Sequence, residues 1–175
     1  MDIGIRRIEP EEHTALGELT ARAYLDGGLL ALGEEDPYME VLRDVAGRDA
    51  QAEVYVAVDA QGALLGGVAF VPAGGPFADI AGPGEAEFRM LAVDARARGR
   101  GTGEALVRAC VERARATPGC VRLVLSTQPT MYAAHRIYDR LGFVRTPERD
   151  WEPVPGLVSL LTYALELQET SRHNM

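Results

Sequence analysis

The sequence predicts a single α/β domain at residues 1–167, followed by a polar tail at residues 168–175. The length of 175 residues fits one domain, because domains usually contain about 100–200 residues. Apolar residues make up 47% and charged residues 25% of the chain, values that exclude disordered, collagen-like and coiled-coil classes. Segments with the two-residue period of strands alternate with segments that have helical spacing, so both kinds of element are expected around one core.

The first half of the chain predicts a strand, two helices and a hairpin. The expected elements are a strand at residues 3–8, helices at 11–25 and 38–46, and hairpin strands at 54–58 and 64–71. The second helix is expected to begin after Asp36-Pro37 and to end at Gly47, because these residues are common at helix starts and ends. Prolines and glycines in residues 72–84 predict a long loop, which is a candidate for the rim of a substrate site.

The second half predicts strands and helices on either side of a glycine-rich connection. The expected elements are strands at residues 86–93, 121–125, 144–149 and 160–167, and helices at 104–116 and 131–141. Pro118-Gly119 and Gly142 mark the ends of the two helices. A turn is expected at residues 153–156, and the preceding Trp151 is expected either to wall an acceptor pocket or to cover the edge of the sheet.

The glycine-rich connection Arg98-Gly99-Arg100-Gly101-Thr102-Gly103 carries the strongest chemical signal. Glycines between a strand and a helix let the backbone approach a ligand closely, and the amides of the helix N-terminus favour an anion. The connection therefore predicts a phosphate-binding site, with a simple tight turn as the alternative. A Walker motif is excluded because the chain has no lysine, and Glu9-Pro10 occupies the turn where a dinucleotide motif would lie.

Charge is distributed unevenly along the chain. The net charge is -8, with 14 acidic residues and five arginines in residues 1–60, but five acidic residues and eleven arginines in residues 96–150. No nucleic acid partner is expected of so acidic a chain, because nucleic acid binding depends on neutralising many phosphates. A small bound anion is expected instead between Arg96 and Arg149.

Metal sites, disulfide frameworks and membrane spans are not expected. The two cysteines are too few for a disulfide framework, and the three histidines lack the spacing of metal ligands. No apolar run is long enough to span a bilayer, and no signal peptide opens the chain. The predicted location is therefore cytoplasmic, with no membrane partner.

Two motifs in the second half resemble those of a known family. Arg98-x-x-Gly101-x-Gly103 follows the strand residues 89–93, and Ala134-His135-Arg136-Ile137-Tyr138-Asp139-Arg140-Leu141-Gly142-Phe143 comes after the next expected strand. In this order, the two motifs resemble the GCN5-related N-acetyltransferase (GNAT) family. The resemblance covers residues 85–144.

The resemblance implies a mixed, mostly antiparallel sheet flanked by helices, with acetyl-CoA as the co-substrate. The residues implied at the pyrophosphate are Arg98, Gly99, Arg100, Gly101, Thr102 and Gly103. The pantetheine is expected in a splayed gap between the strands at 86–93 and 121–125, against the backbone of Leu91, Ala92 and Val93. Met131 stands where the family pattern has an asparagine that usually contacts the pantetheine.

Two residues are candidates for acid–base chemistry. The resemblance places Tyr138 near the thioester sulfur, where a phenol with an ordinary pKa of about 10 is able to protonate a leaving thiolate. The alternative is a tyrosine that only packs against the next strand. Glu87 resembles the glutamate that some members of the family use to deprotonate the amine through water, and the alternative is a solvated strand carboxylate.

Together these features predict an N-acetyltransferase that moves an acetyl group from acetyl-CoA to a primary amine of a small molecule or peptide. A non-catalytic acyl-CoA-binding sensor with the same fold is the alternative. Polyamines, aminoglycosides, amino acids and peptide amines all fit as acceptors. A homodimer is also compatible with the sequence.

Overall fold

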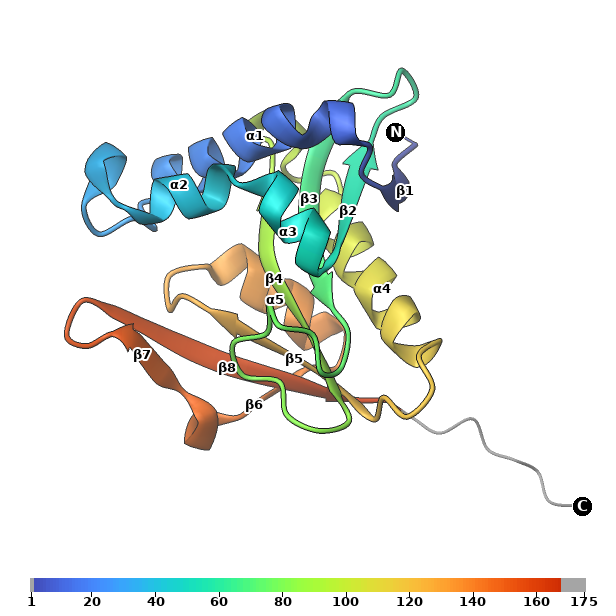
Figure 1. Ribbon diagram of the computed structural model, residues 1–175, viewed down its shortest axis with the longest axis vertical. Helices are drawn as coiled ribbons and strands as arrows, with labels where there is room; N and C mark the ends of the chain where they lie inside the picture. Colours follow the sequence, from blue (N-terminus) through green and yellow to red (C-terminus); the bar gives the residue numbers. More distant parts are fainter. Residues whose placement is uncertain (1, 168–175) are drawn as a thin grey trace, which may run out of the picture.

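An eight-stranded sheet forms the centre of the protein in a computed structural model, which describes residues 2–167 (Figure 1). The strand order is β1-β2-β3-β4-β5-β8-β6, and β7 pairs with β8 beside this path. Its strands are β1 Gly4–Arg7, β2 Glu53–Val58, β3 Leu64–Val71, β4 Glu85–Val93, β5 Arg122–Thr127, β6 Val144–Arg145, β7 Trp151–Val154 and β8 Val158–Glu166. In this part of the chain only β4 and β5 pair in parallel, so the predicted mixed, mostly antiparallel sheet is confirmed.

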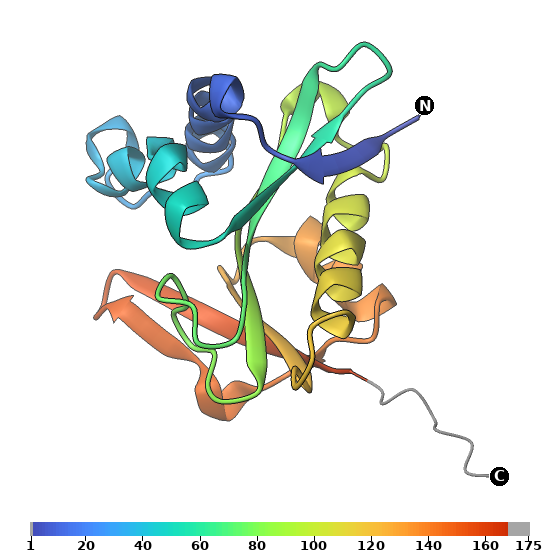
Figure 2. The same cartoon turned by 45° about the vertical axis from the view of Figure 1, so that its right-hand side comes forward.

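Helices cover both faces of the sheet. They are α1 His13–Asp26, α2 Tyr38–Arg43, α3 Val45–Gln51, α4 Thr102–Arg115 and α5 Tyr132–Arg140. Helices α1, α2 and α3 lie on one side, and α4 and α5 lie on the other (Figures 1 and 2). None of the helices in residues 2–167 combines the length and the apolar character that a bilayer span requires.

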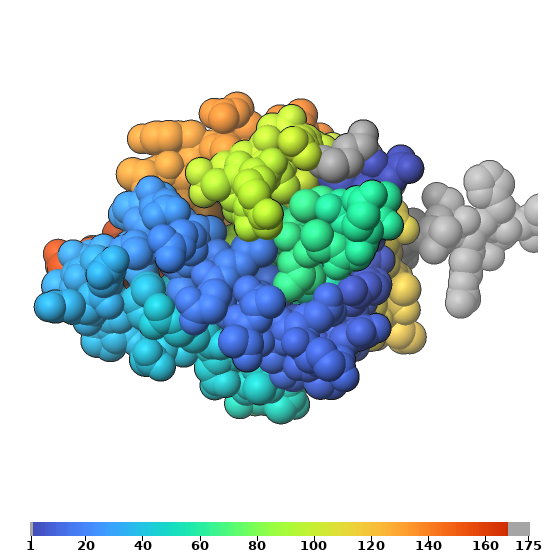
Figure 3. Space-filling view, turned by 90° about the horizontal axis from the view of Figure 1, so that it is seen from above, coloured from blue at the N-terminus to red at the C-terminus, as the bar shows by residue number. Residues whose placement is uncertain are grey.

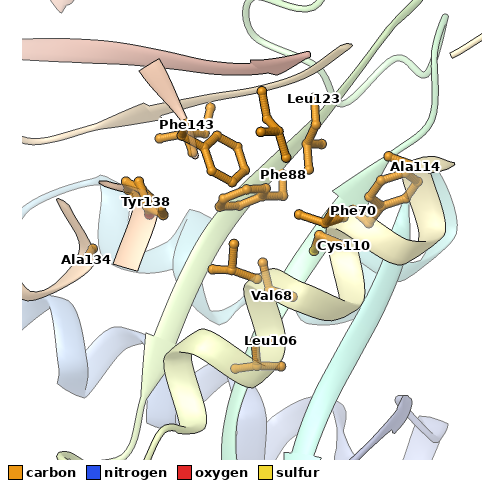
Figure 4. Close-up of a cluster of buried hydrophobic side chains, with 14 of the residues drawn as sticks. Val68, Phe70, Phe88, Leu106, Cys110, Ala114, Leu123, Ala134, Tyr138 and Phe143 are labelled. Atoms are coloured by element: carbon orange, nitrogen blue, oxygen red, sulfur yellow. The ribbon is translucent and has the colours of Figure 1, made fainter. Parts of the chain in front are cut away.

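The largest hydrophobic cluster lies between the sheet and helices α4 and α5. The ring of Phe88 on β4 lies 5.9 Å from that of Tyr138 and 6.1 Å from that of Phe143, centroid to centroid (Figure 4). Leu106 and Cys110 of α4 are fully buried in the same cluster. Alternate β4 residues face opposite layers, so the residues on either side of Phe88 face α1 and α2.

Strand β4 carries a bulge that changes its course. Val68 of β3 is matched by two residues, Met90 and Leu91, because Gly67 pairs with Ala92 and Ala69 pairs with Arg89. Met90 has a φ of 57°, the left-handed region that is uncommon for a residue with a side chain. Such bulges bend a strand and often lie beside functional sites.

Two predicted elements differ from the structure because local capping interrupts them. The helix expected at 38–46 divides at Asp44 into α2 and α3. The Asp44 carboxylate accepts a hydrogen bond from the Gly47 amide and caps α3, so Gly47 lies inside a helix and does not end one. The buried Arg48 of α3 donates to the carbonyls of Val41 and Leu42 in the last turn of α2.

The strand expected at 144–149 is shorter than predicted. It ends at Arg145, because Pro147 lacks a backbone donor and begins a 3-10 turn at Pro147–Arg149. The turn expected at 153–156 is narrower, since Pro153 and Val154 belong to β7, and the chain reverses into β8 after them. The predicted tail at residues 168–175 lies outside the described residues.

Candidate active site

The glycine-rich connection lies at the N-terminus of α4 and leaves open space around its backbone. Gly99 and Gly101 have φ angles of 73° and 81°, and no atom lies within 4 Å of a Cβ placed at either position. A side chain at Gly101 would strain the backbone and occupy space that a ligand could use, but it would not collide with the protein. Figure 3 shows this segment, in yellow-green, at the surface between α5 and the turn that joins β2 to β3.

A cleft of about 550 Å³ runs from this connection between β4 and α5. Eight of the nine residues expected at the cofactor line it: Leu91, Ala92, Val93, Arg98, Gly99, Gly101, Thr102 and Gly103. Arg100 is exposed and is not among the lining residues. The Thr102 hydroxyl donates to the Ala97 carbonyl at 3.2 Å, so this buried side chain holds the connection in shape.

Strands β4 and β5 separate before the part of β4 that lines the cleft. They pair only over Glu85 to Glu87 on β4, although β4 continues to Val93. Beyond this point the bulge at Met90 turns the strand away, which produces the splayed gap expected between the two strands. Met131, at the start of α5, lines the cleft, and its sulfur accepts a hydrogen bond from Thr127.

Tyr138 lies in the core beside this gap. Its side chain is 2% exposed, and its ring packs against Phe88, Phe143 and Tyr163, so the expected packing contact with neighbouring strands exists. Burial raises the pKa of Tyr138, which keeps the phenol protonated. In residues 2–167 every fully buried side-chain nitrogen or oxygen has a partner, yet the Tyr138 hydroxyl makes no hydrogen bond there. Tyr138 is not among the residues that line the cleft.

Glu87 lies on the opposite face of β4 and is 0% exposed. The reading of Glu87 as a solvated strand carboxylate is therefore wrong. Its carboxylate accepts hydrogen bonds from the backbone amides of Asp79, Ile80 and Ala81, at 2.8–3.1 Å. Burial raises the pKa of Glu87, while the three amide hydrogen bonds act against that rise.

The amides on Glu87 belong to a segment that we call the strap, residues 77–82 of the loop between β3 and β4. Arg89 of β4 also holds it, since the guanidinium donates to the Phe77 carbonyl, lies 4.2 Å from the Phe77 ring centroid and pairs with Asp79 at 3.0 Å. The long loop was predicted from prolines and glycines. Its attachment to β4 was not, because hydrogen bonds to backbone amides leave no sequence pattern.

Aromatic side chains gather where the strap meets the helices. Tyr24 of α1 and Tyr38 of α2 have ring centroids 6.4 Å apart, and both, like Phe77, pack against the buried cluster that includes Met90. Burial raises the pKa of both tyrosines, so both phenols stay protonated. Tyr24 also lines the cleft, which connects this cluster to the glycine-rich connection. The sequence gave no signal for this group beyond helical spacing.

Trp151 joins β7 to β5 on the same face of the sheet as Glu87. Its indole nitrogen donates to the Ser126 hydroxyl at 3.0 Å. Trp151 is therefore tied to the central sheet two residues after Arg149, which contacts the strap. Cys110 is buried in an apolar cluster that raises its thiol pKa, which excludes an active nucleophile at this position.

The residues present fit an acyl-CoA molecule. A pyrophosphate needs converging amides and room, and the open turn at Gly99 and Gly101 before the long helix α4 supplies both. The adjoining cleft is lined by β4 backbone and the α5 side chains of Ala134 and Ile137, which suits a long, flexible and mostly apolar chain.

This fold and cleft define the class of acyltransferases built on a bulged, splayed mixed sheet. Residues 15–143 match the family described as Acetyltransferase (GNAT) family. Because the match covers well over half of its length, the chain belongs to the GNAT acetyltransferase family.

Individual relatives are more distant. A segment of 71 residues, 41% of this chain, is 37% identical to N-acetylaspartate synthetase from Danio rerio, and the match spans 25% of that relative's length. The phosphinothricin acetyltransferase (Pat) of Sinorhizobium meliloti, solved in complex with AcCoA, is 18% identical, with a TM-score of 0.72 over 98% of this chain and 91% of that chain. The structure of yncA from Salmonella typhimurium with acetyl-CoA is 20% identical, with a TM-score of 0.70 over 97% and 96%. These two structures share the fold.

Proposed function

We propose that this protein is an N-acetyltransferase that moves an acetyl group from acetyl-CoA to a primary amine of a small molecule or peptide. The observation that carries the proposal is that one cleft joins the glycine-rich connection to the part of β4 that no longer pairs with β5. Two structures with the same fold contain acetyl-CoA, which supports this choice of co-substrate.

Transfer of an acetyl group to an amine needs a neutral amine and a proton for the thiolate that leaves. Tyr138 is the proposed acid, because its phenol stays protonated and its hydroxyl has no protein partner among the described residues. In the reaction the amine nitrogen forms a bond to the acetyl carbon, the carbon–sulfur bond breaks, and the phenol proton passes to sulfur.

Glu87 is the proposed base. It lies on the side of β4 where Tyr24, Tyr38 and Phe77 gather, which is the proposed acceptor side. The strap places a condition on this role, because amides of residues 79–81 cover the carboxylate. A water or an amine reaches Glu87 only when at least one of these hydrogen bonds opens.

The covered base also supports a second candidate, the acyl-CoA-binding sensor without catalysis. If the strap never releases Glu87, the cleft binds acyl-CoA but no amine is deprotonated. The two candidates differ in one measurement. An enzyme releases free thiol from acetyl-CoA continuously when amine is present, whereas a sensor binds acetyl-CoA and releases none.

The acceptor is best sought by a thiol-release screen over four amine classes: polyamines, aminoglycosides, amino acids and peptides. Amino acids are tested first, because a 71-residue segment of the chain is similar to N-acetylaspartate synthetase. Steady thiol release with any class supports the enzyme, and no release with all four contradicts it. The cytoplasmic location and the homodimer stay predictions.

A further inference from the structure

The strap lies across one charged face of β4. Glu85, Glu87 and Arg89 alternate with apolar residues along the strand, and all three point away from the core that contains Phe88. Each of the three holds the strap: Glu85 accepts from the Gly82 amide, while Glu87 and Arg89 bind residues 77–81. Figure 2 shows the loop between β3 and β4 folded back beside β4.

One residue outside β4 completes these attachments. The peptide at Ile80 is held at both ends, because its amide donates to Glu87 at 2.8 Å and its carbonyl accepts from Arg149 at 2.9 Å. Arg149 also binds both oxygens of Glu85, at 2.8 and 2.9 Å. The fork of the guanidinium therefore joins a fixed carboxylate on β4 to the middle of the strap.

The strap contributes to the wall of the proposed acceptor side through Phe77. This ring packs against the same buried cluster as Tyr24 and Tyr38, and Tyr24 lines the cleft. A displacement of the strap would therefore change the acceptor side while leaving the glycine-rich connection at α4 untouched. Arg149 lies outside both motifs of the family, six residues after the second one ends at Phe143, so neither motif suggests this role.

We propose that Arg149 is a positioning residue, which holds the strap against Glu87 through the Ile80 carbonyl and thereby shapes the acceptor side of the site. The kinetic part of this proposal rests on the proposed function. The structural part does not, because it concerns only the order of the strap.

Arg122 provides a matched control. It also donates to Glu85, at 2.8 Å, and its charge is the same as that of Arg149. Its other carboxylate partner is Glu166 on β8, and no hydrogen bond joins Arg122 to residues 77–82. Removing either arginine takes one cation from Glu85, but only Arg149 removal releases the strap.

The experiment compares Arg149→Met with Arg122→Met by residue-resolved amide hydrogen exchange. In Arg149→Met, exchange of the Asp79, Ile80 and Ala81 amides is expected to accelerate by about tenfold or more. The reason is that the variant lacks the hydrogen bond to the Ile80 carbonyl, which opposes local opening of the strap. In Arg122→Met these amides are expected to exchange within about twofold of the wild-type rate. Equal acceleration in both variants, or none in Arg149→Met, would overturn the proposal. If Arg149→Met does not fold, Arg149→Gln is measured with the same criteria.

Steady-state kinetics supply the second readout. With an acceptor found by the thiol-release screen, Arg149→Met is expected to raise the acceptor KM by about tenfold while the acetyl-CoA KM changes less than about twofold. A parallel rise of both KM values indicates general damage and contradicts a positioning role. If the wild type releases no thiol with any amine, the proposed function fails, and the exchange comparison still decides the role of Arg149.

Discussion

The side chains of Glu87 and Tyr138 lie on opposite faces of strand β4, to which Glu87 belongs. The Glu87 carboxylate is bound by the strap on the α1 and α2 side, while the Tyr138 ring packs against Phe88, the next residue of β4, on the α4 and α5 side. The proposed base and acid are therefore separated by the strand that borders the gap. This arrangement suits a reaction in which Glu87 takes a proton from the amine on one face of β4 and Tyr138 gives a different proton to the sulfur from the other face.

Replacing Gly101 by valine should abolish acetyl-CoA binding. The φ angle of 81° disfavours any side chain, and the added atoms would occupy the open space of the turn. Gly156 is the matched control, because its φ is 75°, its surroundings are also open and it lies in the β7–β8 hairpin. Calorimetry should show wild-type affinity for acetyl-CoA in Gly156→Val and an affinity lower by about tenfold or more in Gly101→Val. Unchanged affinity in folded Gly101→Val would remove the pyrophosphate assignment.

Glu87→Gln should lower turnover mainly below the pH optimum. An amine is mostly protonated there and needs the base, whereas at high pH the free amine needs less help. Burial raises the pKa of Glu87, so the wild-type rate should fall with decreasing pH at a higher pH than for an ordinary carboxylate. Glutamine does not titrate, so the variant should lack this part of the pH dependence. A profile that superimposes on the wild type would show that Glu87 acts only as an attachment for the strap.

Glu85 should make folding stability depend on pH in the acid range. The hydrogen bond from Arg149 is the main cause that lowers the pKa of Glu85 to about 2, from 4.5. Because the folded pKa lies below the unfolded one, this stabilisation is complete above pH 4.5 and is lost as the pH falls towards 2.

Urea unfolding at several pH values between 2 and 6 tests this effect. Glu85→Gln should be less stable than the wild type at pH 6, and the difference should shrink towards pH 2. Glu166→Gln is the control, since Glu166 also pairs with Arg122 but its side chain is 69% exposed. An equal effect of both substitutions would mean that burial of Glu85 adds nothing.

Tyr138→Phe should lower kcat by roughly a hundredfold and leave the acetyl-CoA KM nearly unchanged, because a general acid acts mainly in the transition state. Phenylalanine keeps the ring contacts with Phe88, Phe143 and Tyr163, and thermal unfolding checks that the variant stays folded. A kcat within about threefold of the wild type would make Tyr138 a packing residue only.

Much of the fold was predictable because its signals are local. Hydrophobic alternation depends only on neighbours in sequence, and it predicted the hairpin strands at 54–58 and 64–71 to within one residue. The glycine-rich connection likewise predicted the start of α4 to within two residues. Errors arose where a capping side chain or a proline intervened. Asp44 divides the helix expected at 38–46, because its side chain accepts from the Gly47 amide. Pro147 begins a 3-10 turn, so the strand expected at 144–149 ends early.

The candidate site was predictable only in part, for a related reason. The connection around Gly101 can be recognised from its closely spaced glycines and arginines. Eight of the nine residues expected at the cofactor line the cleft. The contacts of Glu87 depend on backbone amides in a loop that no pattern positions, so its full burial was not predictable. Likewise, nothing in the sequence indicates that Arg149 reaches the Ile80 carbonyl across 69 residues of chain.

The most direct test of the proposed function measures free thiol and acetylated product together, with purified protein, acetyl-CoA and an amine from each acceptor class. The proposed function predicts that thiol and acetylated amine appear in equal amounts, in many turnovers, for at least one class. Mass spectrometry of the product places the acetyl group on the nitrogen. Tight binding of acetyl-CoA with no thiol release in the presence of any amine would contradict it and would favour the acyl-CoA sensor.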